Sequence, residues 1–351
     1  MNRNTIFRFS FVLLALLCCA LFSGCKEDGG NSEAKSQAVA GGNDLPASGQ
    51  PGKTGSGGKN SGKSSGKNSG KNSQQKDLPL RDNTPKVLVP SADGTVTYGS
   101  DLVTIDASNT GEGYVMVRYM GNNPKVKLQI QTPDGNKYTY LLSQEKEFET
   151  FPLPSGDGSY TLTVYENVVD DKYTVACSQE IDVTVRDEFL PFLYPNQYVS
   201  FTADSKTVAM GEDVSEGACT DLDVVTNIYH YVTEHITYDT DKATSVTYGY
   251  LPDIDETIAT GKGICFDYAS VMSSMLRSQQ IPTKLEVGYA GEAYHAWISV
   301  YLKETGWVDN VIEFDGKNWS LMDPTFAAGG NNKALKEFIG DGNNYVVKYS
   351  Y

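Results

Sequence analysis

Residues 26–86 form a long segment that offers almost nothing to bury. They consist mainly of Gly, Ser, Asn, Lys and Gln and include the near-repeat SGKSSGKNSGKNS. Such a composition cannot bury enough apolar surface to offset the entropy lost on ordering the chain. We therefore predict a disordered tether over residues 25–85, with an r.m.s. span of about 40–45 Å. The part of the chain that can fold is then residues 86–351.

The pattern of the first residues predicts a targeting sequence. Arg3 and Arg8 precede an apolar run from Phe9 to Phe22, which is shorter than the roughly 20 residues that a membrane span needs. The run leads into LFSGC, which resembles the lipobox of bacterial lipoproteins. The resemblance implies a signal peptide over residues 1–24, a lipid anchor on Cys25, and export to the outer face of the bacterial cell membrane. The alternative is an ordinary cleaved signal peptide that leaves the protein free.

Charge is distributed unevenly along the chain. Basic residues outnumber acidic ones in residues 1–85, so residues 86–351 are more acidic than the whole chain, whose formal net charge is −15. Binding to nucleic acid requires clustered Lys and Arg against the phosphates. We therefore predict that nucleic acid is not a partner.

Cysteines are few once the signal region is set aside. Cys177, Cys219 and Cys265 remain in the folded part. Cys177 and Cys219 could form a disulfide between two domains or remain as buried free thiols. There is no CxxC pair, no HExxH and no calcium-loop pattern, so we predict no metal site and no cofactor.

Residues 86–186 alternate in the manner of β-strands. The segments YVMVRYM, KVKLQIQT, NKYTYLLS, SYTLTVYENV and KYTVACSQEIDVTV are rich in Val, Tyr and Thr and are separated by turn signals such as TPDGN and PSGDGS. Several short strands at this spacing predict an immunoglobulin-like β-sandwich. We expect a spacer or a binding module here.

Residues 187–351 change to helices followed by strands. Residues 221–239 carry apolar residues at helical spacing, with Asp221 as a plausible N-cap, and a second helix is predicted to begin at Cys265 and to end before IPTK. The strands TKLEVGYA, AYHAWISVYL and WSLMDPT follow. This order predicts an α+β domain in which helices pack on an antiparallel sheet.

Cys265 lies where a thiol can become a nucleophile. A free cysteine is mostly protonated at neutral pH, because its pKa is about 8.5. The N-terminus of a helix favours an anion through its unpaired N–H groups and partial positive charge. Gly261 and Gly263 allow a tight turn before the helix, and the same N–H groups could hold the oxyanion of a tetrahedral intermediate.

Two further residues complete a possible triad. His295 lies within a predicted strand, where alternation places it on the same face as Trp297 and could direct the imidazole toward a helix end. Asp323 lies in the next apolar strand, where a carboxylate is costly unless it is paired. Taken alone, Asp323 also fits a turn residue before Pro324.

These residues carry a resemblance to the transglutaminase-like, papain-related thiol enzymes. The matching segments are YD at 238–239, GKGICFDYA at 261–269, RSQQIPTKLEVGY at 277–289, HAW at 295–297 and DPT at 323–325. The resemblance implies Cys265 as nucleophile, His295 as general base and Asp323 as the residue that orients the histidine. It also implies that Trp297 packs beside the site.

A Cys-His-Asp triad predicts acyl transfer through a thioester. We expect a cell-surface enzyme that acts on peptide or amide bonds, with hydrolysis favoured over cross-linking, and with a peptide or protein as substrate. The alternative is a surface module that keeps this fold and binds peptides or takes part in adhesion without turnover.

Overall fold

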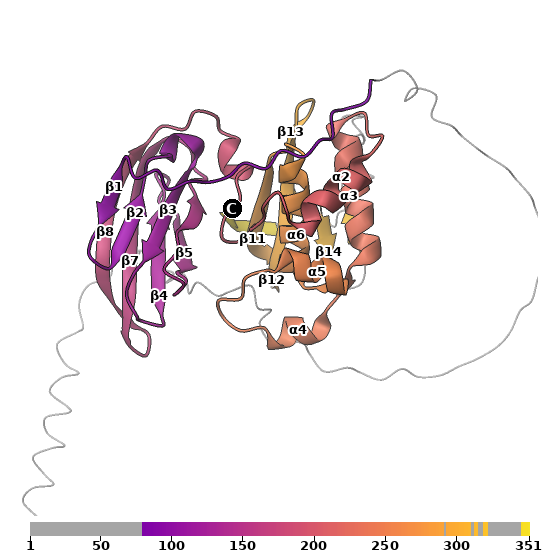
Figure 1. Cartoon of the computed structure of the whole chain (residues 1–351). Coiled ribbons are helices and arrows are strands. Elements are labelled where there is room, and N and C mark those ends of the chain that lie inside the picture. The colour runs from indigo at the N-terminus through magenta and orange to yellow at the C-terminus, as the bar shows by residue number, and fades with distance from the viewer. Residues whose placement is uncertain (1–78, 291–292, 310–311, 315–318, 322–344) are drawn as a thin grey trace, which may run out of the picture. The chain divides into compact units, whose positions relative to one another are not determined.

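The computed structural model describes residues 79–290, 293–309, 312–314, 319–321 and 345–351 (Figure 1). The predicted signal peptide, Cys25, residues 25–78 of the predicted tether and Asp323 lie outside the described residues. Among the described residues, no helix combines the length and the apolar character that crossing a membrane requires.

The first part of the described chain consists of β-strands in two four-stranded antiparallel sheets (Figure 1). One sheet has the order β1-β2-β3-β6 and the other β5-β4-β7-β8. The strands are β1 (Thr97–Gly99), β2 (Val103–Asp106), β3 (Tyr114–Tyr119), β4 (Val126–Gln131), β5 (Lys137–Leu141), β6 (Glu149–Pro152), β7 (Gly158–Val169) and β8 (Lys172–Val183).

The alternating pattern of the sequence explains the core of these sheets. In β4 the side chains of Val126, Leu128 and Ile130 are buried, and the residues between them are partly exposed. All five segments predicted as strands in this region are strands. The short strands β1, β2 and β6 were not predicted. The immunoglobulin-like assignment of the two sheets remains a prediction.

Helices follow, as the change of pattern predicts. They are α2 (Lys206–Ser215), α3 (Asp221–His235), α4 (Thr240–Ser245), α5 (Ile254–Thr260) and α6 (Cys265–Ser278). The N-cap of α3 is Thr220 and not Asp221: the Thr220 hydroxyl accepts from the Asp223 N–H, and the Asp223 carboxylate accepts from the Thr220 N–H. This capping box satisfies two N–H groups that the helix start leaves open.

Helix α6 is the centre of the second part of the chain. All of its residues from Cys265 to Ser278 are buried. It packs against β11 (Thr283–Ala290) and β12 (Ala293–Leu302) on one side and against α2 and α3 on another. A helix that is covered all round is part of a core, not of a surface.

The sheet beside α6 has the strand order β13-β12-β11-β16, with all pairs antiparallel. Its outer strands are β13 (Gly306–Val308) and β16 (Tyr345–Ser350). Two small sheets pair β9 (Thr237–Tyr238) with β10 (Lys262–Gly263) and β14 (Ile312–Phe314) with β15 (Trp319–Leu321). The second part is therefore a mixed domain of helices and antiparallel sheet, as predicted.

Residues 79–86 are hydrogen-bonded to this mixed domain. The Arg81 guanidinium pairs with Asp221 at 2.7 Å, at the start of α3, and the Lys86 N–H donates to the Ser278 carbonyl at 2.8 Å, at the end of α6. Residues 79–85 belong to the segment predicted as tether, so this described part of the tether lies against the core.

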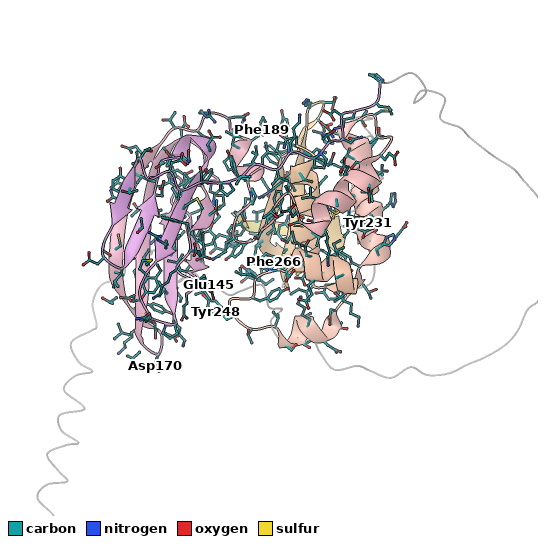
Figure 2. All side chains as sticks on the ribbon, viewed as in Figure 1. Glu145, Asp170, Phe189, Tyr231, Tyr248 and Phe266 are labelled. Atoms are coloured by element: carbon teal, nitrogen blue, oxygen red, sulfur yellow. The ribbon has the colours of Figure 1, made fainter. Side chains whose placement is uncertain are left out.

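Aromatic side chains connect β5 with the start of α6. Tyr138 packs edge-on against Tyr351, with 5.5 Å between ring centroids. Tyr140 lies 5.5 Å from Tyr198, and Tyr198 lies 5.3 Å from Phe266. Phe266 follows Cys265 directly and is buried in the interior of the molecule (Figure 2).

The described cysteines form no disulfide. Cys177 lies on β8 and is half-buried, and Cys219 is also half-buried, with its sulfur 3.9 Å from the Gly217 carbonyl oxygen. The disulfide alternative is therefore wrong. The other alternative, two buried free thiols, overestimates how deeply these residues lie.

Candidate active site

Cys265 occupies the first position of α6, as the sequence predicts. Ile264 is the N-cap and has an extended backbone conformation. The Ile264 N–H donates to the Asp267 carboxylate at 2.8 Å, so the side chain of Asp267 caps the helix start. Cys265 is only 8% exposed. The thiol therefore lies at a helix N-terminus that is itself buried.

Gly261 and Gly263, which precede Cys265, are glycines for different physical reasons. Gly261 has φ of +62°, and a Cβ there would lie 2.9 Å from the His235 carbonyl oxygen, so glycine fits its left-handed backbone at no steric cost. Gly263 is needed for space, because a Cβ there would lie 2.7 Å from the Asp267 Cβ. The glycine at 263 thus lets the capping carboxylate approach the turn.

A short parallel pairing brings Tyr238 to Cys265. The Thr237 N–H donates to the Gly261 carbonyl at 2.8 Å, and the Asp239 N–H donates to the Gly263 carbonyl at 2.9 Å. Tyr238 is thereby a neighbour of Cys265, which influences the Tyr238 hydroxyl. Burial and the neighbouring thiol both raise the pKa of Tyr238, so its hydroxyl keeps its proton and can donate it in a hydrogen bond.

Strand β12 also lies near the sulfur of Cys265. The backbone N–H groups of Ala296, of Phe266 and of Cys265 itself lower the pKa of the thiol. Strand β13 pairs with β12 from Val300 to Leu302, so Ala296 lies outside this pairing. The predicted nucleophile thus lies beside the backbone of the residue that follows His295.

The strand alternation predicted for β12 is correct. His295 and Trp297 stack on one face with ring centroids 6.3 Å apart, while Ala296 and Ile298 are buried in the core. His295 is half-buried. Trp297 is 2% exposed, and its predicted place beside a catalytic site remains a prediction.

Glu286 on β11 holds Trp297 in place. Its Oε2 accepts from the Trp297 indole Nε1–H at 2.8 Å and from the Ser299 hydroxyl at 2.8 Å. Burial raises the pKa of Glu286. This carboxyl group was not predicted, since a glutamate in a strand gives no sequence signal until its partners on the neighbouring strand are known.

Burial controls the protonation of the two predicted catalytic groups. It raises the pKa of the Cys265 thiol to about 11, against the effect of the N–H groups of Ala296 and Phe266, and the Asp267 carboxylate adds to the rise. Burial also lowers the pKa of His295 to about 4. At neutral pH both groups are therefore uncharged: the thiol holds a proton, and the imidazole has a free lone pair that can accept one.

Some of the groups that acyl transfer to sulfur would use lie among the described residues. Cys265 provides a thiol, the neutral imidazole of His295 can act as a general base, and the backbone N–H groups at the start of α6 can donate to a developing oxyanion. Tyr238 adds a hydroxyl whose pKa the neighbouring thiol raises. Asp323 and Cys25 lie outside the described residues, so the roles predicted for them remain predictions.

Comparisons with known proteins identify the family that part of this chain matches. Residues 208–310 match the family model of the transglutaminase-like superfamily, so the chain contains a transglutaminase-like domain. The matched range includes Cys265 and His295. No curated protein matches the sequence.

Two solved structures are similar to parts of this one. A candidate cysteine protease from Cytophaga hutchinsonii shares 14% identity with a TM-score of 0.33, over 73% of this chain and 74% of that chain. A candidate protease from Parabacteroides distasonis shares 12% identity with a TM-score of 0.25, over 57% of this chain and 60% of that chain.

Proposed function

We propose that this protein is a thiol enzyme that cleaves peptide or amide bonds through a thioester. The observation that supports it most directly is the position of Cys265. It lies at the start of a buried helix, and the backbone N–H of Ala296, the residue next to His295, acts on its thiol and lowers its pKa.

The proposed reaction starts from an uncharged pair. As the Cys265 sulfur attacks the substrate carbonyl carbon, His295 takes the thiol proton, so that a neutral thiol becomes a nucleophile only at the moment of attack. The carbonyl oxygen becomes an oxyanion, toward which N–H groups at the start of α6 can donate. Asp323 is proposed to orient His295.

The tetrahedral intermediate then collapses. The C–N bond breaks, the leaving amine takes the proton from His295, and an acyl thioester remains on Cys265. Water attacks this thioester, with His295 again taking the proton, and the free acid and the Cys265 thiol are released. If an amine attacks instead of water, the product is a new amide, and the enzyme is a transglutaminase.

We also propose a place for the protein in the cell. The segment LFSGC supports lipidation at Cys25 and anchoring to the outer face of the bacterial membrane. The tether would then hold the enzyme away from the membrane, with the two β-sheets of residues 97–183 as an immunoglobulin-like spacer or binding module. Its substrate would be a peptide or protein at the cell surface.

The proposal is tested by acyl trapping on purified protein. Incubation with p-nitrophenyl acetate should give a burst of p-nitrophenolate and an acetyl group on Cys265, located by peptide mass spectrometry. Cys265→Ser and His295→Ala should lose the burst. Cys177→Ser is the matched control, since that thiol is half-buried on β8, and it should behave as the wild type.

The alternative module, which binds without turnover, predicts a different result. It predicts no burst and no acetyl group on Cys265 beyond the level on Cys177. Such a result would refute the enzyme proposal, provided that circular dichroism shows the protein to be folded.

A further inference from the structure

A carboxylate is buried two residues after the proposed nucleophile. Asp267 is 0% exposed and lies in the first turn of α6, where its side chain caps the Ile264 N–H. An unpaired carboxylate at such depth is strongly disfavoured, because it loses its solvation by water. Its presence beside Cys265 therefore calls for a counter-charge.

Lys242 supplies that counter-charge from another part of the chain. Its Nζ donates to Asp267 Oδ2 at 2.8 Å and to the Tyr250 hydroxyl at 2.6 Å. The Tyr250 hydroxyl in turn donates to Asp267 Oδ1. The lysine side chain is 30% exposed and the aspartate side chain 0%, so this pair is less screened by water than a surface pair.

The pair lies where charge should form during the proposed reaction. The Asp267 carboxylate raises the pKa of the Cys265 thiol and of the Tyr238 hydroxyl, because a negative charge opposes a second one nearby. In the part of the chain that the structure describes, Tyr238 on β9 and His295 on β12 are two further titratable groups of the proposed site. Both are uncharged at neutral pH, so neither offsets the carboxylate.

We propose that Lys242 is a positioning residue of the site, whose ammonium group neutralises Asp267 and so permits negative charge to develop on the Cys265 sulfur. This inference rests on the proposed function, because the charge on the sulfur matters only if Cys265 is a nucleophile. Its test does not require catalytic activity. The same contact fixes helix α4 against the start of α6. Asp267 thus caps the helix that carries the thiol, and Lys242 removes the electrostatic penalty of that cap.

Two variants that each remove one charge distinguish this role from a structural one, because they should change the ease of thiolate formation at Cys265 in opposite directions. Lys242→Met leaves the carboxylate unpaired and should make the thiolate harder to form. Asp267→Asn leaves the ammonium unpaired and should make the thiolate easier to form. The double variant restores neutrality and should resemble the wild type. If the contact were purely structural, both single variants would change thiolate formation at Cys265 in the same direction.

The readout is the rate of iodoacetamide alkylation at Cys265 at pH 8, followed by peptide mass spectrometry. A charge within a few ångströms moves a pKa by about one unit or more, which is about a tenfold change in thiolate population. We expect Lys242→Met to react about tenfold more slowly than the wild type and Asp267→Asn about tenfold faster. Lys242→Arg should retain the wild-type rate.

Exposed neighbours provide matched controls. Lys262 lies on β10 and Asp241 on α4, and both are exposed. Because water screens such charges, Lys262→Met and Asp241→Asn should change the alkylation rate by less than about twofold.

Rate changes of the same sign in the two single variants, or no change in either, would overturn the proposal. If Lys242→Met does not fold, the comparison of Asp267→Asn with the double variant decides instead, and Asp267→Asn must react faster. The assay involves no substrate. Opposite rate changes together with failed acyl trapping would therefore keep the Lys242 inference about charge and refute the proposed function.

Discussion

The pH dependence of Cys265 reactivity tests the electrostatics of the site. With a pKa of about 11, the thiol should behave differently from a free cysteine, whose pKa is about 8.5. The difference of about 2.5 units means a thiolate population about 300-fold smaller at neutral pH. Alkylation of the folded protein should therefore be far slower than alkylation of the same cysteine in protein unfolded in guanidinium chloride.

The shape of the pH profile carries the same information without a reference thiol. Between pH 6 and pH 9 the alkylation rate at Cys265 should rise about tenfold per pH unit with no plateau, since the whole range lies below the pKa. His295 should be neutral throughout, because its pKa is about 4. His295→Ala should therefore leave the slope unchanged.

One result would refute this reasoning. A rate that is already high near pH 6, levels off below pH 8 and falls in His295→Ala would mean that a thiolate and an imidazolium exist as a pair at rest. The partial positive charge at the start of α6 and the histidine would then outweigh burial. In that case His295 would hold its proton before substrate arrives instead of taking it during attack.

Three further predictions concern stability, measured by urea unfolding. A His295 pKa of about 4 in the folded state against about 6.5 unfolded means that the unfolded chain binds more protons between these values. Stability should fall by up to about 3 kcal/mol as pH drops from 6.5 to 4, and His295→Gln should lack this component; an unchanged pH dependence would contradict the pKa. Arg277→Met should lower the free energy of unfolding by several kcal/mol, because the buried Arg277 guanidinium donates to three backbone carbonyls. Arg186 lies on the surface, so Arg186→Met should lower it by less than about 1 kcal/mol. Equal losses in the two variants would be evidence against the role of burial. Trp297→Phe should lower the free energy of unfolding by about 1–3 kcal/mol, because the buried Glu286 Oε2 loses the indole donor and keeps only the Ser299 hydroxyl. Glu286→Gln combined with it should recover part of that loss.

Local pattern predicted the parts of the site that depend on neighbours in sequence. The glycine turn, the helix beginning at Cys265 and the shared face of His295 and Trp297 follow from residues a few positions apart. At α3 the same reasoning placed the N-cap one residue too late, because Asp221 and Thr220 are both good caps and only the position of Asp223 decides between them.

The contacts that determine charge in the site could not be predicted in this way. Lys242 and Asp267 are 25 positions apart in sequence, and a lysine in a short polar segment reads as solvent-exposed. Glu286 and Trp297 meet only through the pairing of β11 with β12. Sequence also cannot tell how deeply a helix start is buried. It therefore predicted a lowered thiol pKa from the helix terminus, where burial raises the pKa instead.

The burial of α6 connects these observations. A helix terminus favours an anion through its N–H groups. At the start of α6 two groups can use this effect: the Asp267 carboxylate, and the Cys265 sulfur when it becomes a thiolate. The carboxylate takes the Ile264 N–H at 2.8 Å and stabilises the helix, but its charge opposes a thiolate. A surface helix would leave that charge to water. Since α6 is buried along its whole length, a protein group must neutralise the carboxylate, and Lys242 is placed to do so. The cap that makes this helix start stable is thus compatible with a nucleophile only while its lysine partner is present.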